Sequence, residues 1–127
     1  TTPQQVATSV ARRGLEMFTK VGVAVLGVVE NMSTFLCPKC GHEEALFGEG
    51  GGAELAAACG VPLLGQLPLN GAIRAQTDVG CPPVAADPEG PLALRYREIA
   101  RRVAFELARR PKDQKHKFPK IVVEKQK

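Results

Sequence analysis

Long apolar runs are missing from this sequence of 127 residues. No stretch approaches the ~20 consecutive apolar residues that span a bilayer, and no signal peptide opens the chain. An initiator methionine is also missing, because residue 1 is threonine and the two methionines are Met17 and Met32. We therefore expect no membrane partner, and we favour the interpretation that this chain is a piece of a longer or processed protein.

Aromatic residues are scarce, at 5% of the sequence. The net charge of +4 could indicate a nucleic-acid partner, but its location argues against one. Residues 109–127 carry a net charge of +6, whereas residues 1–108 carry −2. A charged terminal tail is usually solvated, and the rest of the chain has no stripe of basic and aromatic residues. We expect no nucleic-acid partner.

Cysteine is limited to four residues, Cys37, Cys40, Cys59 and Cys81. They could pair as two disulfides, but the absence of secretory signals favours the reducing cytosol. In that compartment a CxxC pair is more often metal-binding or redox-active. We therefore predict a cytoplasmic protein with a functional Cys37–Cys40 pair.

The apolar pattern alternates between helices and strands along the chain. Thr2-Pro3-Gln4-Gln5 is typical of a helix start, with Thr2 as the cap and Pro3 at the first helical position, and the helix is predicted to run to about Lys20. The nearly continuous apolar run from Val21 to Val29 predicts a strand buried on both faces of a parallel sheet. A short helix is predicted at Ala53–Cys59.

The second half of the chain continues the alternation. A second strand is predicted at Leu63–Leu67 and a helix at Asn70–Asp78. A long amphipathic helix follows from about Glu89, with a packed apolar stripe whose last member is Leu107. "FPKIVVEK" fits either an edge strand or an ordered arm. Helices between strands predict an α/β fold with a parallel sheet, and two strands alone suggest part of a larger sheet.

Several segments together resemble one family. "TTPQQVA", "VAVLGVVENMSTFLCPKCGH", "LFGEGGGAELA", "GVPLLGQLPL" and "IRAQTDVGCPP" succeed one another as in Mrp/ApbC-type iron–sulfur carrier ATPases, P-loop proteins related to MinD. The resemblance covers roughly residues 1–108. It implies an ATP-binding protein, using Mg²⁺, that holds a [4Fe–4S] cluster between the subunits of a homodimer and transfers it to apoproteins.

The sequence also departs from this family. No GK[ST] phosphate-binding loop occurs, and the aspartate-bearing switch segment is missing. In the family these parts come earlier in the chain. We therefore expect the C-terminal half of a P-loop NTPase domain at 1–110, with its CxxC loop at 31–47, and a basic tail at 111–127. We expect no ATP hydrolysis by this chain alone.

Cys37 and Cys40 are the predicted metal ligands. A [4Fe–4S] cluster takes four thiolates, so two chains that each contribute this pair would complete it. Cys59 and Cys81 are predicted to be structural thiols, and His42 is not expected to be a ligand. The alternative is a small zinc-binding structural or interaction module, and a thioredoxin-like redox role is less favoured because Pro38 and Gly41 suggest a loop.

Asn31 follows the predicted valine-rich strand, where open α/β sheets bind ligands. A carboxamide can both donate to and accept from the edge of adenine, although an asparagine here could simply turn the chain. The resemblance implies that Asn31 contacts the adenine of the nucleotide and that the segment Leu67-Pro68-Leu69 lines its other side. The glycine-rich stretch Phe47–Glu54 is predicted to be a sharp turn and helix start, because its glutamates would repel phosphate.

Overall fold

The computed structural model describes residues 1–110, and the tail at 111–127, including the possible strand in "FPKIVVEK", lies outside the described residues. The elements in chain order are α1 (Gln5–Lys20), β1 (Val28–Glu30), β2 (Phe35–Leu36), β3 (Glu43–Glu44), α2 (Gly51–Ala58), β4 (Leu63–Gln66), α3 (Gly71–Asp78), α4 (Pro83–Ala86) and α5 (Pro91–Ala108). Within residues 1–110 no helix is long and apolar enough to cross a membrane.

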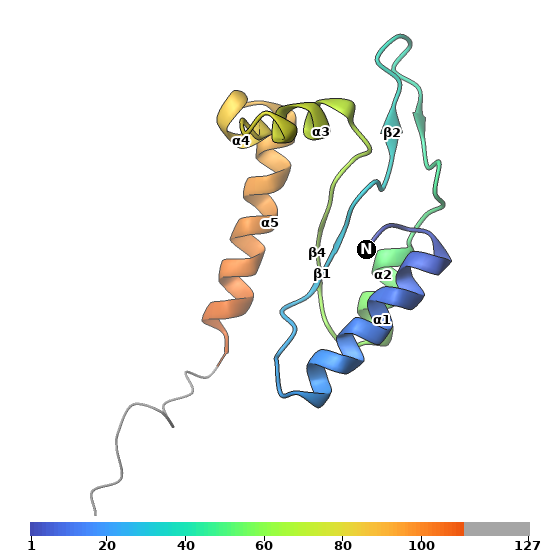
Figure 1. Cartoon of the computed structure of the whole chain (residues 1–127), viewed down its shortest axis with the longest axis vertical. Coiled ribbons are helices and arrows are strands. Elements are labelled where there is room, and N and C mark those ends of the chain that lie inside the picture. Colours follow the sequence, from blue (N-terminus) through green and yellow to red (C-terminus); the bar gives the residue numbers. More distant parts are fainter. Residues whose placement is uncertain (111–127) are drawn as a thin grey trace, which may run out of the picture.

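Two parallel strands form the centre of the molecule. β1 pairs with β4 in the register Val28 with Leu63, Val29 with Gly65 and Glu30 with Gln66, with an irregularity after Val28. Helices α1 and α2 lie on one side of this pair and α5 on the other, while the β2–β3 hairpin projects beyond one end (Figure 1). The predicted α/β class with parallel strands is therefore confirmed.

The core is small and lies between the strands and α2. Val28, Leu55 and Ala56 are buried together, and Cys59 and other partly buried apolar residues pack against them. On the other face Ile99 of α5 lies against Gly65, where an added Cβ would come within 2.5 Å of the Ile99 side chain. These contacts fix the ends of β1 and β4, after which the candidate site begins.

The predicted strand Val21–Val29 is wrong for most of its length, because β1 begins only at Val28. α1 is followed by a turn in which Gly22 has φ +73° and the Val23 N–H donates to the Phe18 carbonyl. The side chains of Val21 and Val23 are 67% and 51% exposed. Strand pairing starts where the Val28 N–H donates to the Pro62 carbonyl. A run of β-branched residues forms a strand only where a neighbouring segment offers hydrogen-bond partners to its main chain.

The predicted helix start at Thr2 is also wrong. α1 begins at Gln5 after Gln4, which makes no side-chain cap. The residues before α1 contact the sheet and α2 instead. The Thr1 carbonyl accepts from the Asn31 N–H. The Pro3 main chain lies so close to Gly51 of α2 that an added Cβ there would collide with it. The chain entry is therefore fixed by tertiary contacts.

The later helices agree better with the sequence. α2 starts two residues earlier than predicted, and α3 begins after Asn70, whose side chain accepts from the Ala72 N–H. α4 was not expected within its proline-rich segment. The apolar stripe of α5 is partly buried only as far as Val103. The prediction that Leu107 packs with this stripe is wrong, because Leu107 is 61% exposed and lies beyond the two-stranded sheet.

Candidate functional site

Cys37 and Cys40 lie on the tight turn that joins β2 to β3. The strands pair antiparallel, with Phe35 opposite Glu44 and Leu36 opposite Glu43. The turn is closed by the Cys37 N–H donating to the His42 carbonyl at 2.8 Å and by the Gly41 N–H donating to the Cys37 carbonyl at 2.9 Å. Gly41 has φ +71°, a left-handed conformation that glycine adopts without steric cost. The CxxC pair thus lies in a hairpin turn. The sequence predicted a loop here rather than a helix start, and the structure agrees.

The turn stabilises the thiolate of Cys37. The main-chain N–H groups of Cys40 and Lys39, and the Cys40 thiol, hydrogen-bond to the Cys37 sulfur and lower the pKa of Cys37 below the ordinary value of a cysteine thiol. These donors favour the charged form of the acceptor. The thiolate is the form of cysteine that binds metals.

The remaining candidate ligands lie elsewhere. Cys59 ends α2 and packs against the core, whereas Cys81 is exposed after α3. All four cysteines are free. Within residues 1–110 no group of three or more His, Cys, Asp or Glu side chains is arranged to hold a metal ion. The turn itself therefore brings together two thiols, those of Cys37 and Cys40.

Asn31 lies directly after β1 and is exposed. Its side-chain oxygen accepts from the Met32 N–H at 2.9 Å, and its own N–H donates to the Thr1 carbonyl. Met32 has φ +57°, which is uncommon for a residue with a side chain. Asn31 thus shapes the turn that ends β1. Its amide nitrogen has two donor hydrogens available for a ligand, because the oxygen makes the turn contact.

The segment Leu67-Pro68-Leu69 lies beside this turn. Beyond β4 the Leu67 N–H donates to the Glu30 carbonyl, the Leu67 carbonyl accepts from the Ser33 N–H, and the Leu69 N–H donates to the Thr34 carbonyl. An isolated parallel bridge joins Leu69 to Phe35, the first residue of β2. Asn31 and Pro68 are therefore on neighbouring segments, and the same ladder leads into the cysteine turn.

Glu30 lies beside the candidate site, and its role was not predicted from the sequence. It is 1% exposed, and its carboxylate accepts from the Gly52 N–H at 2.5 Å and from the Gln66 side-chain amide at 2.6 Å. Gly52 lies in the first turn of α2, so this carboxylate takes the position in which a phosphate would bind a helix N-terminus. The predicted turn and helix start at the glycine-rich stretch is confirmed. One feature of the sequence could have indicated this role: a glutamate ends an otherwise apolar strand.

Solved structures define the class of protein. The cell-division ATPase MinD of Pyrococcus furiosus matches with a TM-score of 0.63 and 25% identity over 83% of this chain and 40% of its own. A nucleotide-binding protein of Archaeoglobus fulgidus, solved in complex with ADP and with cobalt, matches with a TM-score of 0.58 and 32% identity over 76% of this chain and 38% of its own. The fold is thus part of a MinD-like P-loop ATPase fold.

Sequence comparison narrows this class to a family. The family model described as ParA, "NUBPL iron-transfer P-loop NTPase", matches residues 1–104, and the chain belongs to this family of iron–sulfur cluster carrier proteins. An iron–sulfur cluster carrier protein of Pseudomonas fragi is 56% identical over 100 residues, which are 79% of this chain and 35% of the relative. The chain spans about a third of the length of the curated relatives it matches.

Proposed function

We propose that this chain forms the cluster-holding part of an iron–sulfur cluster carrier, with Cys37 and Cys40 as its ligands. The observation that supports this proposal most directly is the β2–β3 hairpin, whose closed turn holds Cys37 and Cys40 together at an exposed end of the molecule. The cluster is cargo. It leaves when thiolates of an apoprotein client replace the cysteines one at a time, each Fe–S(Cys) bond breaking as an Fe–S(client) bond forms. This exchange needs no oxidant or reductant.

The ligand count implies two copies of the chain. A [4Fe–4S] cluster takes four thiolates, and the turn provides two. A two-fold axis through the cluster brings Cys37 and Cys40 of both copies together without further residues. Phe35 is half-buried and Leu36 is 58% exposed beside the turn, so both can add apolar contact around the cluster.

The nucleotide part of the proposal rests on Asn31 and Pro68. The carboxamide of Asn31 lies at the carboxyl end of β1, and Leu67-Pro68-Leu69 follows β4 on the neighbouring segment, so adenine would bind between them. The γ-phosphate and Mg²⁺ need a GK[ST] loop, which this chain does not have. Nucleotide binding is therefore proposed for a molecule that also contains the family's phosphate-binding part.

A reducing compartment is required by this chemistry, because both thiols must remain free. The cytoplasm meets this requirement, and a cytoplasmic location remains our prediction.

Anaerobic reconstitution with iron and sulfide tests the cluster site. We expect about two irons per chain, a broad visible absorption, and a dimer in sedimentation velocity that depends on the cluster. Cys37→Ala and Cys40→Ala should each abolish the absorption and the dimer. Cys59→Ala and Cys81→Ala are matched controls that remove a thiol elsewhere and should leave both unchanged.

Three results would contradict the proposal. A full cluster on a strictly monomeric chain would exclude a site shared between two chains. Loss of the cluster in the Cys59 or Cys81 variant would show that the assignment of the ligands to Cys37 and Cys40 is wrong. If the chain instead binds one zinc ion, shows no visible absorption and holds no cluster after reconstitution, the result would favour a zinc-binding module.

A further inference from the structure

The β2–β3 hairpin is joined to the central strands by two short paired segments. Residues 31–35 lead from β1 into β2, and residues 67–69 follow β4. Main-chain hydrogen bonds pair these segments, and an isolated bridge extends the pairing from Leu69 to Phe35. Within residues 1–110, β2 and β3 pack mainly on each other and project beyond one end of the molecule (Figure 1). We call the segments 31–35 and 67–69 the hairpin base, because the direction of the hairpin is set there.

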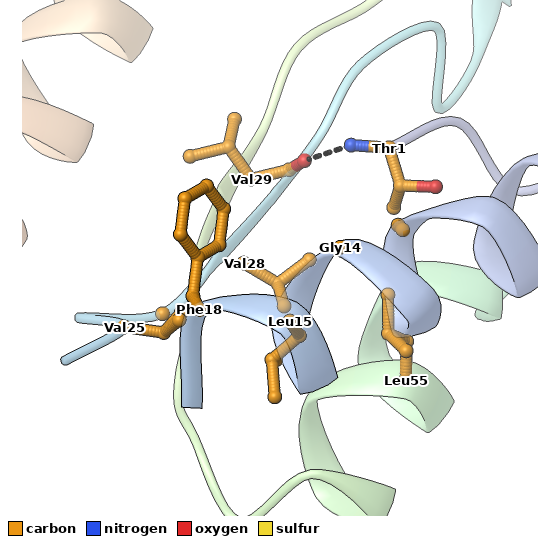
Figure 2. Close-up of a pocket in the computed structure, with 10 residues that line it drawn as sticks. Thr1, Gly14, Leu15, Phe18, Val25, Val28, Val29 and Leu55 are labelled. Carbon is orange, nitrogen blue, oxygen red and sulfur yellow. Dashed lines mark hydrogen bonds between the residues drawn. The ribbon is translucent and has the colours of Figure 1, made fainter. Parts of the chain in front are cut away.

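The end of β1 is firmly held where the hairpin base begins. Glu30 is 1% exposed, and its carboxylate accepts hydrogen bonds from α2 and from β4. The Thr1 nitrogen donates to the Val29 carbonyl at 3.0 Å, as Figure 2 shows, and the Thr1 carbonyl accepts from the Asn31 N–H at 2.8 Å. The freedom of the hairpin to change direction therefore lies beyond Asn31.

Ser33 makes a side-chain hydrogen bond between the two segments, and no other side chain among residues 1–110 does so. Its N–H and its hydroxyl both donate to the Leu67 carbonyl, at 2.9 Å and 3.1 Å, and the residue is 8% exposed. One hydrogen bond fixes a distance but leaves rotation about its axis. A second bond from the same residue to the same oxygen restricts that rotation, because hydrogen bonds weaken when they are misaligned.

A rotation at Ser33 is amplified at the cysteines. Cys37 lies four residues further along the chain, which is about 13 Å for extended residues. A rotation of about 10° at Ser33 then moves the cysteine turn by about 2 Å. This displacement is close to the length of a metal–thiolate bond, about 2.3 Å. The direction of the hairpin therefore decides whether two turns can hold one cluster.

We propose that Ser33 is a positioning residue for the cluster site, whose hydroxyl bond to the Leu67 carbonyl sets the direction in which Cys37 and Cys40 face a second copy of the chain. The inference rests on the proposed function, because it takes two copies to share one cluster. A two-fold axis repeats every error of direction in both copies, so the cluster is sensitive to this bond twice. Ser33 acts through the hairpin and not by contact with the cluster.

The Ser33→Ala variant removes the hydroxyl and keeps the main-chain bond to Leu67, so the chain should remain folded. Thr34→Val is the matched control, because it removes the neighbouring hydroxyl, which makes no hydrogen bond within residues 1–110, and preserves the shape of the side chain. In the cluster-free chain the Leu69 amide, which donates to the Thr34 carbonyl, should exchange its hydrogen about fivefold faster in Ser33→Ala. The control should leave this rate unchanged.

The cluster-loaded dimer gives the decisive measurement. Sedimentation velocity should show a dimer dissociation constant at least about tenfold larger for Ser33→Ala, since each dimer loses two hydrogen bonds. The visible circular dichroism of the cluster should also change, because it reports the geometry of the thiolates around the cluster. A merely structural role of Ser33 would lower Tm and leave both properties unchanged at low temperature. Thr34→Val should match the parent chain in both measurements.

Equal dimer dissociation constants or equal cluster spectra for Ser33→Ala and Thr34→Val overturn the inference, as does unchanged exchange at Leu69. A Ser33→Ala chain that does not fold also overturns it, because the hydroxyl would then hold the whole fold. If the parent chain takes up no cluster, the proposed function fails and the inference fails with it. If the parent chain forms the cluster-bridged dimer and the Ser33 variant is unaffected, the inference alone fails.

Discussion

Removing the Glu30 carboxylate should destabilise the fold more than any exposed substitution. This side chain is 1% exposed and joins α2 to β4 through the Gly52 N–H and the Gln66 side chain. Each hydrogen bond to a charged group contributes about 1.5–3 kcal/mol, and loss of the acceptor leaves a buried donor unsatisfied. We expect Glu30→Ala to lower the free energy of unfolding by about 3–5 kcal/mol, a large share of the stability of a small domain.

Glu30→Gln separates the hydrogen bonds from the charge. The new side-chain oxygen can still accept from the Gly52 N–H, and the new amide can donate to the oxygen of Gln66 once Gln66 rotates by half a turn. Only the charge assistance is lost, so we expect a decrease of about 1 kcal/mol.

Equilibrium unfolding in urea, followed by circular dichroism, measures both variants at constant m. Glu54→Ala is the control, because it removes an exposed carboxylate from the first turn of the same helix and should cost less than about 1 kcal/mol. Glu30→Ala within 0.5 kcal/mol of the parent, or no more costly than Glu54→Ala, would refute the anchoring role.

The remaining predictions concern the thiol and the nucleotide. Because the pKa of Cys37 is lowered in the folded chain, its alkylation by iodoacetamide should persist to lower pH than in the same chain unfolded in urea, and identical pH profiles would contradict this. In a fusion that replaces the matching 100 residues of the P. fragi carrier by this chain, Asn31→Ala should weaken ATP binding by about 1–3 kcal/mol and reduce selectivity over GTP, as measured by calorimetry; unchanged affinity for both nucleotides would leave Asn31 only as a turn residue. The purified 127-residue chain should not hydrolyse ATP, and metal-dependent phosphate release that persists through further purification would refute this.

Local signals predicted much of the fold. The valine-rich run ends in β1, Asn70 caps α3 as a residue of its type should, and the left-handed Gly48 and Gly50 precede α2. Pro38 and Gly41 predicted that the CxxC pair lies in a loop, and the turn between β2 and β3 confirms this. In each case the residues that decide the structure are close together in the sequence.

The predictions from sequence were wrong where contacts between distant segments determine the local structure. Val21–Gly27 has strand composition but pairs with no neighbouring strand among residues 1–110, and Thr2 loses its capping role because Thr1 bonds to β1. The buried contact of Glu30 with Gly52 joins residues that are 22 positions apart. A single sequence does not state which backbone groups meet, so these features could not be derived from it.

Pro68 affects the outer side of the segment that follows β4. Leu67 and Leu69 direct their main-chain groups to the β1 side, so the alternation places the nitrogen of Pro68 on the outer edge, where it has no hydrogen to donate. A proline at an edge discourages the addition of another strand. Pairing of a further strand is thus disfavoured at Pro68, just beyond the end of β4.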